Sequence, residues 1–273
     1  MMTQKAGPAI DSVPDPRRHH LLGMKVDLLA PAEAARTIVT RAAAGERGYV
    51  CVTNVHMCVM TYDDPTFRTI VNASDFALPD STILRRALGL RHRVTPPPSE
   101  KGADLMLRLC AAAERGHLRV ALIGGKDHAV LDVLQRKLKE RFPNLSIAYA
   151  YSPPFRPISP DEVERLAAAL NMSGAQLVFV GLGCPKQERW MAQYKPLVRA
   201  MMIGVGAAFD FNSGAVTPSP GWVHKAGLEW LYRLAAEPRR LGRRYLTTSP
   251  RFLWLLALDA AGLRRNVDLK ADR

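Results

Sequence analysis

The chain has 273 residues, 48% of them hydrophobic, and a formal net charge of +13 at pH 7. This length and hydrophobic fraction exclude an intrinsically disordered protein, and they allow one large domain or one domain with an appendage. No uninterrupted apolar run reaches the ~18 residues of a membrane-spanning helix, so we do not expect the chain to cross a bilayer. The positive charge favours anionic partners, namely nucleic acid, anionic lipid or phosphorylated substrates.

Residues 1–20 are polar and contain three prolines and two arginines, so we interpret them as a flexible N-terminal tail and not as a targeting peptide. Neither the cysteines nor the histidines have the spacing of metal ligands, which favours reduced thiols in the cytosol and no metal site. The four cysteines are Cys51, Cys58, Cys110 and Cys184.

Apolar, β-prone runs recur along the chain, with helical patterns between them. We predict strands at Tyr49–Thr53, Leu118–Ile123, Ser146–Tyr151, Ala175–Val180 and Ala200–Val205. We predict helices at Pro65–Ala73, Thr82–Leu88, Ala103–Arg115 and Ala129–Arg141, and another that begins at Ser159 with a capping box. This alternation is typical of an α/β fold, and we expect a Rossmann-like, mostly parallel sheet with crossover helices over residues 21–220.

Open α/β sheets bind ligands beyond the carboxyl ends of their strands. The first predicted strand ends at Thr53, Asn54 and His56, which offer two hydrogen-bonding side chains and an imidazole. Thr53 and Asn54 could equally cap the following helix, and His56 could be a structural histidine. We keep all three as candidate substrate-binding residues.

Asp80 follows a short apolar run and precedes the helix predicted at Thr82. A partly desolvated carboxylate there can have a pKa near working pH and act as a general base toward a hydroxyl. One such base is enough for a single inverting displacement. The alternative is that Asp80 caps the next helix.

Two glycine-rich turns follow later strands. The segment Ile123–Asp127, with Gly124 and Gly125, offers a cradle for a phosphate or sugar, although strand-turn-helix packing explains it equally well. The segment Gly204–Phe211 contains small residues that let a ligand or a neighbouring backbone approach closely. The G-x-G-x-x-G fingerprint is absent, which argues against a dinucleotide-dependent oxidoreductase.

The segment Gly181–Trp190 joins a predicted strand to a helix through a turn suited to an anion. Gly183 gives the backbone room, and Pro185 fits the first position of a helix, where no N–H is needed. The N–H groups and dipole of that helix end favour a phosphate or diphosphate. An ordinary strand-to-helix turn is the alternative. Three polar residues would lie in the first turn beside the ligand: Lys186, Gln187 and Glu188.

Two prolines and a glycine at residues 217–221 mark the end of the α/β domain. Residues 221–273 carry eleven Lys/Arg against five Asp/Glu, together with several aromatic residues. A helix with arginines on one side and Leu or Trp on the other can lie in a lipid interface, so we predict a helical appendage that docks on an anionic membrane surface. A helical hairpin packed on the core, or an oligomer contact, is the alternative. The candidate contact residues are Trp230, Arg233, Arg239, Arg240, Arg243 and Arg244.

Several of these segments occur together in the order and spacing of one known family. They are Thr53–His56, Pro79–Asp80, Gly102–Leu105, the turn at Gly124, Gly181–Trp190 and Glu229–Leu234 with the residues up to Tyr245. On these residues the chain resembles the WecG/TagA/CpsF family of bacterial glycosyltransferases from about Gly23 to about Tyr245.

The resemblance implies inverting transfer of a hexose-type sugar from a UDP-sugar to a polyprenyl-diphosphate-linked sugar at the cytoplasmic face of the cell membrane. Exopolysaccharide, teichoic acid and surface-antigen synthesis are the processes it implies. It assigns Asp80 as the base, Thr53 and Asn54 to the pocket, and Gln187 to a place beside the substrate. It also implies that the C-terminal appendage brings the enzyme to the membrane. Because helix N-termini and arginines can hold a UDP leaving group, we expect no metal and no other cofactor. On this resemblance we also expect no nucleic-acid partner.

Two positions depart from the family pattern. The family usually has glycine after the aspartate, where this chain has Ser81, whose Cβ disfavours unusual backbone angles. The family also tends to have an arginine shortly before the Gly-x-Asp-Leu element, where this chain has three prolines and Lys101. Either Arg93 or Lys101 substitutes for it, or donor handling differs. The alternative functions are a catalytically weak member, or a non-enzymatic basic protein that binds membrane or nucleic acid.

Overall fold

The computed structural model describes residues 17–154, 156, 159–217, 219, 223, 229–236 and 238–263. Within the last two ranges it leaves out the side chains of residues 229, 233, 236, 238–241 and 243–245. The predicted tail and the end of the predicted α/β domain therefore lie largely outside the described residues.

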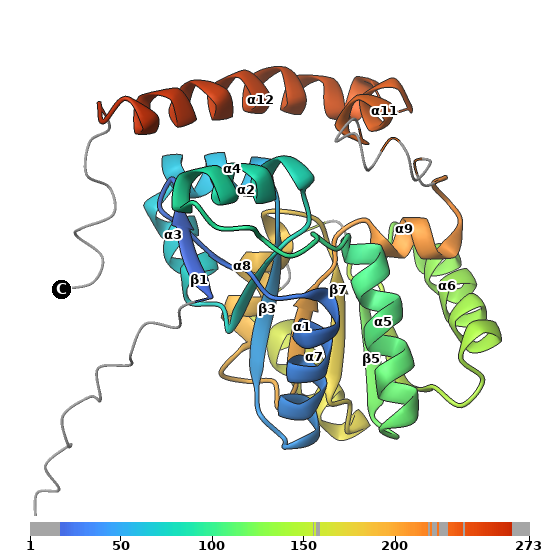
Figure 1. The fold of residues 1–273 in the computed structure, drawn as a ribbon. Helices are drawn as coiled ribbons and strands as arrows, with labels where there is room; N and C mark the ends of the chain where they lie inside the picture. The colour runs from blue at the N-terminus through green and yellow to red at the C-terminus, as the bar shows by residue number, and fades with distance from the viewer. Residues whose placement is uncertain are drawn as a thin grey trace, which may run out of the picture.

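A six-stranded parallel sheet forms the centre of the fold (Figure 1). Its strands are β3 (Gly48–Thr53), β4 (Phe76–Pro79), β5 (Arg119–Gly124), β6 (Ser146–Tyr151), β7 (Leu177–Gly181) and β8 (Met201–Gly204). Their order across the sheet is β4-β3-β8-β7-β5-β6. Because all six are parallel, their carboxyl ends lie along one edge, which we call the carboxyl edge.

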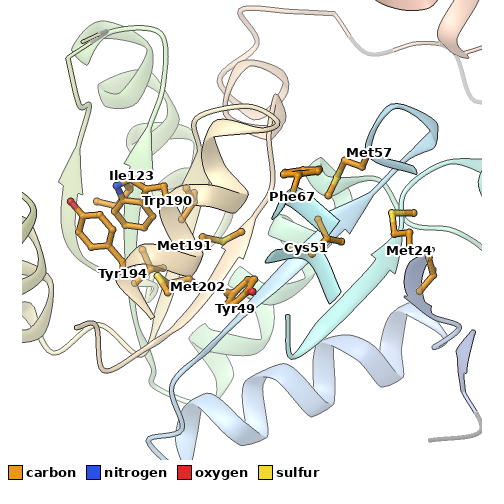
Figure 2. Close-up of a cluster of buried hydrophobic side chains, with 14 of the residues drawn as sticks. Met24, Tyr49, Cys51, Met57, Phe67, Ile123, Trp190, Met191, Tyr194 and Met202 are labelled. Atoms are coloured by element: carbon orange, nitrogen blue, oxygen red, sulfur yellow. The ribbon is translucent and has the colours of Figure 1, made fainter. Parts of the chain in front are cut away.

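Helices cover both faces of the sheet, and a separate hydrophobic core lies on each face. Successive residues of β3 alternate between them, with Tyr49 and Cys51 in one core and Val50 and Val52 in the other. The core that holds Tyr49 and Cys51 is drawn in Figure 2. One face is covered by α1 (Pro31–Ala43), α5 (Gly102–Arg115) and α6 (His128–Arg141). The other is covered by α2 (Val55–Asp63), α3 (Pro65–Asn72), α7 (Pro160–Ser173) and α8 (Lys186–Tyr194).

The predicted α/β alternation is confirmed, and each predicted strand and helix is present with ends shifted by a few residues. The capping box at Ser159 is present, because its hydroxyl accepts from the Glu162 N–H and the Glu162 carboxylate accepts from the Ser159 N–H. The pattern analysis missed α1 and the short strand β4. α1 carries start signals that the pattern analysis did not use, namely Pro31 at its first position and Glu33 in its first turn, whereas β4 has only four residues.

A hairpin of β1 (Arg18–Leu21) and β2 (Met24–Asp27) was also missed. It begins inside the segment that we predicted as a tail, so the prediction is wrong for Arg18 to His20. Arg18 pairs with Asp27 at 2.6 Å, and the other carboxylate oxygen of Asp27 accepts from the Ala77 N–H of β4. The bond between Asp27 and Ala77 holds the hairpin against β4, and local sequence patterns do not report such a long-range contact.

After the sheet come α9 (Ala208–Ser213), α11 (Glu229–Ala236) and α12 (Pro238–Ala260). Figure 1 shows α12 running along the top of the molecule, over α2 and α4 (Thr82–His92). Phe252 and Leu255 of α12 are almost fully buried, and Asp259 pairs with Arg91 of α4 at 2.7 Å. The predicted helical appendage thus packs on the core through one face. No helix in the part of the chain that the structure describes is both long and apolar enough to cross a membrane.

The sheet changes direction of winding between β5 and β7. β5 and β7 are neighbours in the sheet. The strand that follows β5 in the chain, β6, lies beyond β5, whereas the strand that follows β7, β8, lies beyond β7 in the opposite direction. Gly124 pairs with Gly181 at this point, and a Cβ on Gly124 would lie 2.5 Å from the Gly181 carbonyl oxygen. Gly124 also has a φ of +130°, which side chains rarely tolerate. Glycine is therefore required there by both the dihedral angle and the neighbouring strand.

We expect Gly124→Ala to lower the free energy of unfolding by about 2–5 kcal/mol, because backbone strain and overpacking add. Gly45→Ala is the matched control, since Gly45 has a φ of +75° but no atom within 4 Å of the added methyl group. That control should lose only about 1–2 kcal/mol. Urea denaturation measures both, and equal losses would contradict the close approach of β5 and β7.

Candidate active site

A pocket of about 850 Å³ opens at the carboxyl edge, beside the ends of β5, β7 and β8. Its volume is within the range of small-molecule sites, about 300–1,000 Å³. Ligands of open α/β folds bind where the winding direction changes, which here is the point between β5 and β7. The lining includes Gly125 and Lys126 after β5, Gly183 and Lys186 after β7, and Gly206 after β8. All five residues belong to segments that the sequence analysis singled out, and Gly125, Gly183 and Lys186 were named as candidates.

The turn after β7 has the predicted strand-to-helix form, with one correction. Pro185 is the N-cap of α8 and follows a cis peptide bond with Cys184, so it is not the first helical residue as predicted. Gly183 has a φ of +76°, and a Cβ there would meet no atom within 4 Å. The helix begins at Lys186, and its N-terminal turn faces the pocket through Gly183 and Lys186.

Gln187 and Glu188 also lie in the first turn of α8, but they are buried and do not line the pocket. Gln187 is 3% exposed, and its Oε1 accepts a hydrogen bond from the Gly206 N–H at 3.0 Å. Glu188 is completely buried, and its Oε1 accepts from Gln187 Nε2 at 2.8 Å. Burial raises the pKa of Glu188, and the hydrogen bond from Gln187 acts in the opposite direction.

Asp80 lies directly after β4, beside the end of β3. Its N–H donates to the Thr53 carbonyl oxygen at 2.8 Å, and the Thr53 hydroxyl donates to the Leu78 carbonyl oxygen at 3.1 Å. Thr53 is fully buried, whereas Asp80 is half-buried. Thr53 therefore fixes the end of β4 and with it the position of Asp80.

The helix caps at this edge are Asn54 and Ser81. Asn54 Oδ1 accepts from the Met57 N–H at 3.1 Å, so the capping alternative for Asn54 is confirmed. Ser81 caps α4 through Leu84, so Asp80 is not the N-cap of α4. Ser81 has a φ of −99°, an ordinary extended angle, and its departure from the family glycine causes no backbone strain.

His56 connects this edge to the appendage. Its Nδ1 lies 3.3 Å from the Thr248 hydroxyl of α12, and Thr248 is 7% exposed. The appendage therefore reaches a predicted site residue directly. Trp230 of α11 is half-buried, while the side chains of Arg233, Arg239, Arg240, Arg243 and Arg244 lie outside the described part of the chain.

Lys101 lies close to the end of β8. It precedes α5, and the next residue, Gly102, is so near that a Cβ on it would lie 2.7 Å from the Val205 carbonyl oxygen. Lys101 Nζ donates to the Ser219 hydroxyl at 3.4 Å. Of the two cations considered as substitutes for the family arginine, Lys101 is thus held at the carboxyl edge by its helix.

The predicted site residues form two groups on one edge. Thr53, Asn54, His56 and Asp80 follow β3 and β4, whereas the pocket lies at β5, β7 and β8. Three inter-strand spacings separate β4 from β7, or about 14 Å. Gln187 lies against the pocket group, because it accepts from Gly206 after β8, the strand that pairs with β3.

Several pocket residues were missed by the sequence analysis. Pro153, Pro154 and Arg156 follow β6, while Lys126, Trp190 and Asp210 lie in or beside segments that we singled out without naming these residues as part of a site. Because β6 was predicted and ligands of α/β sheets bind beyond the carboxyl ends of strands, the sequence could have indicated Pro153, Pro154 and Arg156. The position of a strand end does not indicate Trp190, because this residue lies in the middle of α8 and reaches the pocket only through the way α8 packs on the sheet.

The chain matches the model of the glycosyl transferase WecG/TagA/CpsF family over residues 19–266. It therefore belongs to this family. Membership makes it a glycosyltransferase, of the kind that acts in cell-envelope polymer synthesis. The match includes the pocket, Asp80 and the described helices of the appendage.

The raised pKa of Glu188 predicts how the free energy of unfolding changes with pH. Because its pKa is raised in the folded protein, the unfolded chain loses this proton at lower pH, and stability falls as pH rises above the ordinary value of 4.5 toward the folded pKa. Glutamine has no such proton. We expect the melting temperature of Glu188→Gln relative to wild type to increase steadily across that range. The relative free energy of unfolding should change by about 1.4 kcal/mol for each pH unit in which only the folded protein holds the proton.

Glu140→Gln, at an exposed carboxylate near the end of α6, is the matched control and should show no such trend. Thermal unfolding between pH 4.5 and 8 measures both variants, and a Glu188→Gln difference independent of pH would contradict the prediction.

Proposed function

We propose that this protein is an inverting glycosyltransferase that moves a hexose-type sugar from a UDP-sugar to a polyprenyl-diphosphate-linked sugar. One observation carries the proposal. A pocket with glycine turns and two lysines lies at the winding switch of the sheet, on the same edge as a half-buried aspartate. Family membership supports a sugar as the transferred group.

The pocket suits the nucleotide diphosphate end of the donor. Lys126 and Lys186 bring positive charge to its wall, and the N-terminal end of α8 adds the positive end of a helix dipole. Arg156 also lines the pocket, where it pairs with Glu162 at 2.7 Å. The glycines at 125, 183 and 206 let a ligand approach the backbone.

Asp80 is the proposed base. In an inverting displacement the acceptor hydroxyl attacks the anomeric carbon, its proton passes to the carboxylate, and the bond to UDP breaks on the opposite side of that carbon. The separation between the pocket and Asp80 supports an elongated ligand that lies along the carboxyl edge, with its nucleotide over β5 and β7 and its sugar toward β3 and β4. Gln187 and Thr53 would lie between these two ends.

The leaving group is UDP, which departs with its negative charge on the diphosphate. Lysines and helix N-termini can stabilise that charge when they are already in place, so we propose that the reaction needs no metal ion. Lys101 would add a third lysine near the end of β8.

The acceptor in this proposal is anchored in lipid, so the enzyme has to work at the membrane surface. The outward face of α12 carries Leu246, Leu253 and Trp254, which are 74%, 62% and 58% exposed. Residues 246 and 253 are two helical turns apart, on the side opposite Phe252 and Leu255. The arginines at 239–244 belong to the same helix. This combination supports peripheral docking on the inner face of the cell membrane.

We expect Asp80→Asn to reduce turnover by about 10²–10⁴, because proton transfer in the transition state loses its acceptor. UDP binding should stay within about threefold of wild type, since Asp80 does not line the pocket. Release of UDP from UDP-sugars, with a short polyprenyl-diphosphate sugar as acceptor, measures turnover, and calorimetry measures binding. Glu140→Gln is the matched control for loss of a carboxylate. Full activity of Asp80→Asn would remove the base assignment, and no UDP binding by wild type would remove the donor assignment.

We expect the double variant Leu253→Ser/Trp254→Ser to bind anionic liposomes about tenfold or more weakly, because two apolar side chains no longer enter the interface. Its melting temperature should change little, since both residues are exposed. Met172→Ser on α7 is the matched control, with an 86% exposed apolar residue away from α12. Liposome sedimentation is the measurement, and undiminished binding by the double variant would count against this surface.

A further inference from the structure

Among the described residues, the carboxyl group of Glu188 is a buried polar group that the proposed mechanism does not use. It is completely buried, and its Oε2 has no hydrogen-bond partner among the described residues. A buried polar group with an unused hydrogen-bonding atom costs stability, so its presence requires an explanation. Contact with the substrate does not supply the explanation, because Glu188 does not line the pocket.

Gln187 is an amide whose two ends have nearly the same shape but opposite hydrogen-bonding character. In the structure its Oε1 faces the Gly206 N–H at 3.0 Å and its Nε2 faces Glu188 Oε1 at 2.8 Å. With the amide rotated by half a turn, Nε2 would face the N–H, donor against donor. Glu188 supplies the acceptor that favours the first orientation.

The backbone that Gln187 holds is part of the pocket. Gly206 and Ala207 line it, and Gly206 has a φ of +59°. The preceding strand end is packed closely against the same side chain, since a Cβ on Gly204 would lie 3.0 Å from Gln187 Nε2. The chain of contacts therefore runs from a buried carboxyl, through one amide, to the wall of the pocket.

We propose that Glu188 is a positioning residue for the donor pocket, which fixes the amide of Gln187 so that Gly206 and the turn after β8 keep the shape that binds the nucleotide. The role of the pocket rests on the proposed function, whereas the effect of Glu188 on Gly206 does not. Glu188 acts without touching the ligand.

Three variants separate this role from simple damage to α8. Glu188→Met removes the acceptor at similar volume. Glu188→Gln keeps a carbonyl oxygen for Gln187 and resembles the neutral acid that burial favours. Tyr194→Phe is the matched control, because it removes a buried hydroxyl that has no hydrogen-bond partner in the described structure from the same helix. Figure 2 shows Tyr194 stacked on Trp190, and the ring centroids are 4.0 Å apart.

Two measurements are made on each full-length protein: the dissociation constant for UDP by calorimetry, and the hydrogen-exchange rate of the Gly206 amide by NMR. We expect Glu188→Met to raise the dissociation constant and the exchange rate about tenfold each, since Gln187 Nε2 loses its acceptor and the amide is then held only at its Gly206 end. Glu188→Gln should stay within about threefold of wild type, and Tyr194→Phe should match wild type.

Wild-type values for Glu188→Met, or equal losses in all three variants, would overturn the proposal. If Glu188→Met does not fold, Glu188→Asp replaces it, because the shorter side chain withdraws the acceptor from Gln187. If wild type binds no UDP, the proposed function fails, and the exchange rate of Gly206 still decides whether Glu188 positions the turn.

Discussion

The close approach of β5 and β7 is the constraint on which the site depends. Gly124 and Gly181 face each other in the ladder at the point where the sheet reverses its winding, and neither could carry a side chain without a clash. A Cβ on Gly181 would lie 2.9 Å from the Phe209 ring of α9, so the missing side chain at Gly181 also lets α9 pack against the end of β7. The pocket opens directly beyond these glycines because the strands can end there side by side.

One helix connects the pocket to the core of the fold. The N-terminal turn of α8 faces the pocket through Lys186, while Gln187, one residue further on, turns inward to hold Gly206. Behind it, Glu188 and Trp190 are buried, and Trp190 belongs to the core that also contains Cys51 of β3. Packing of α8 against the sheet is therefore coupled to the shape of the pocket, through Gln187 and Glu188, which do not line it, and through Trp190, which does.

The appendage is both a part of the fold and the proposed membrane contact. Its inner face buries Phe252 and Leu255 and brings Thr248 to His56, and its outer face exposes Leu253 and Trp254. A helix that is apolar on two opposite sides needs a partner on each side, and the core provides only one. The alternatives that we set against each other from sequence, packing on the core and docking on a membrane, are therefore compatible, because they use different faces of α12.

The sequence by itself determined the α/β class, five of the six strands, the capped helix at Ser159 and the turns at Gly124 and Gly183, because periodicity, caps and glycine turns are local. Only the tertiary structure decided which strands are neighbours, and hence that Asp80 lies on the same edge as the pocket but three strands from β7. It also decided that Glu188, which the sequence places in the first turn of α8 beside the predicted ligand, is buried, and that Trp190 reaches the pocket. The order of strands and the direction of a side chain in a helix depend on long-range packing, which leaves no periodic trace in the chain.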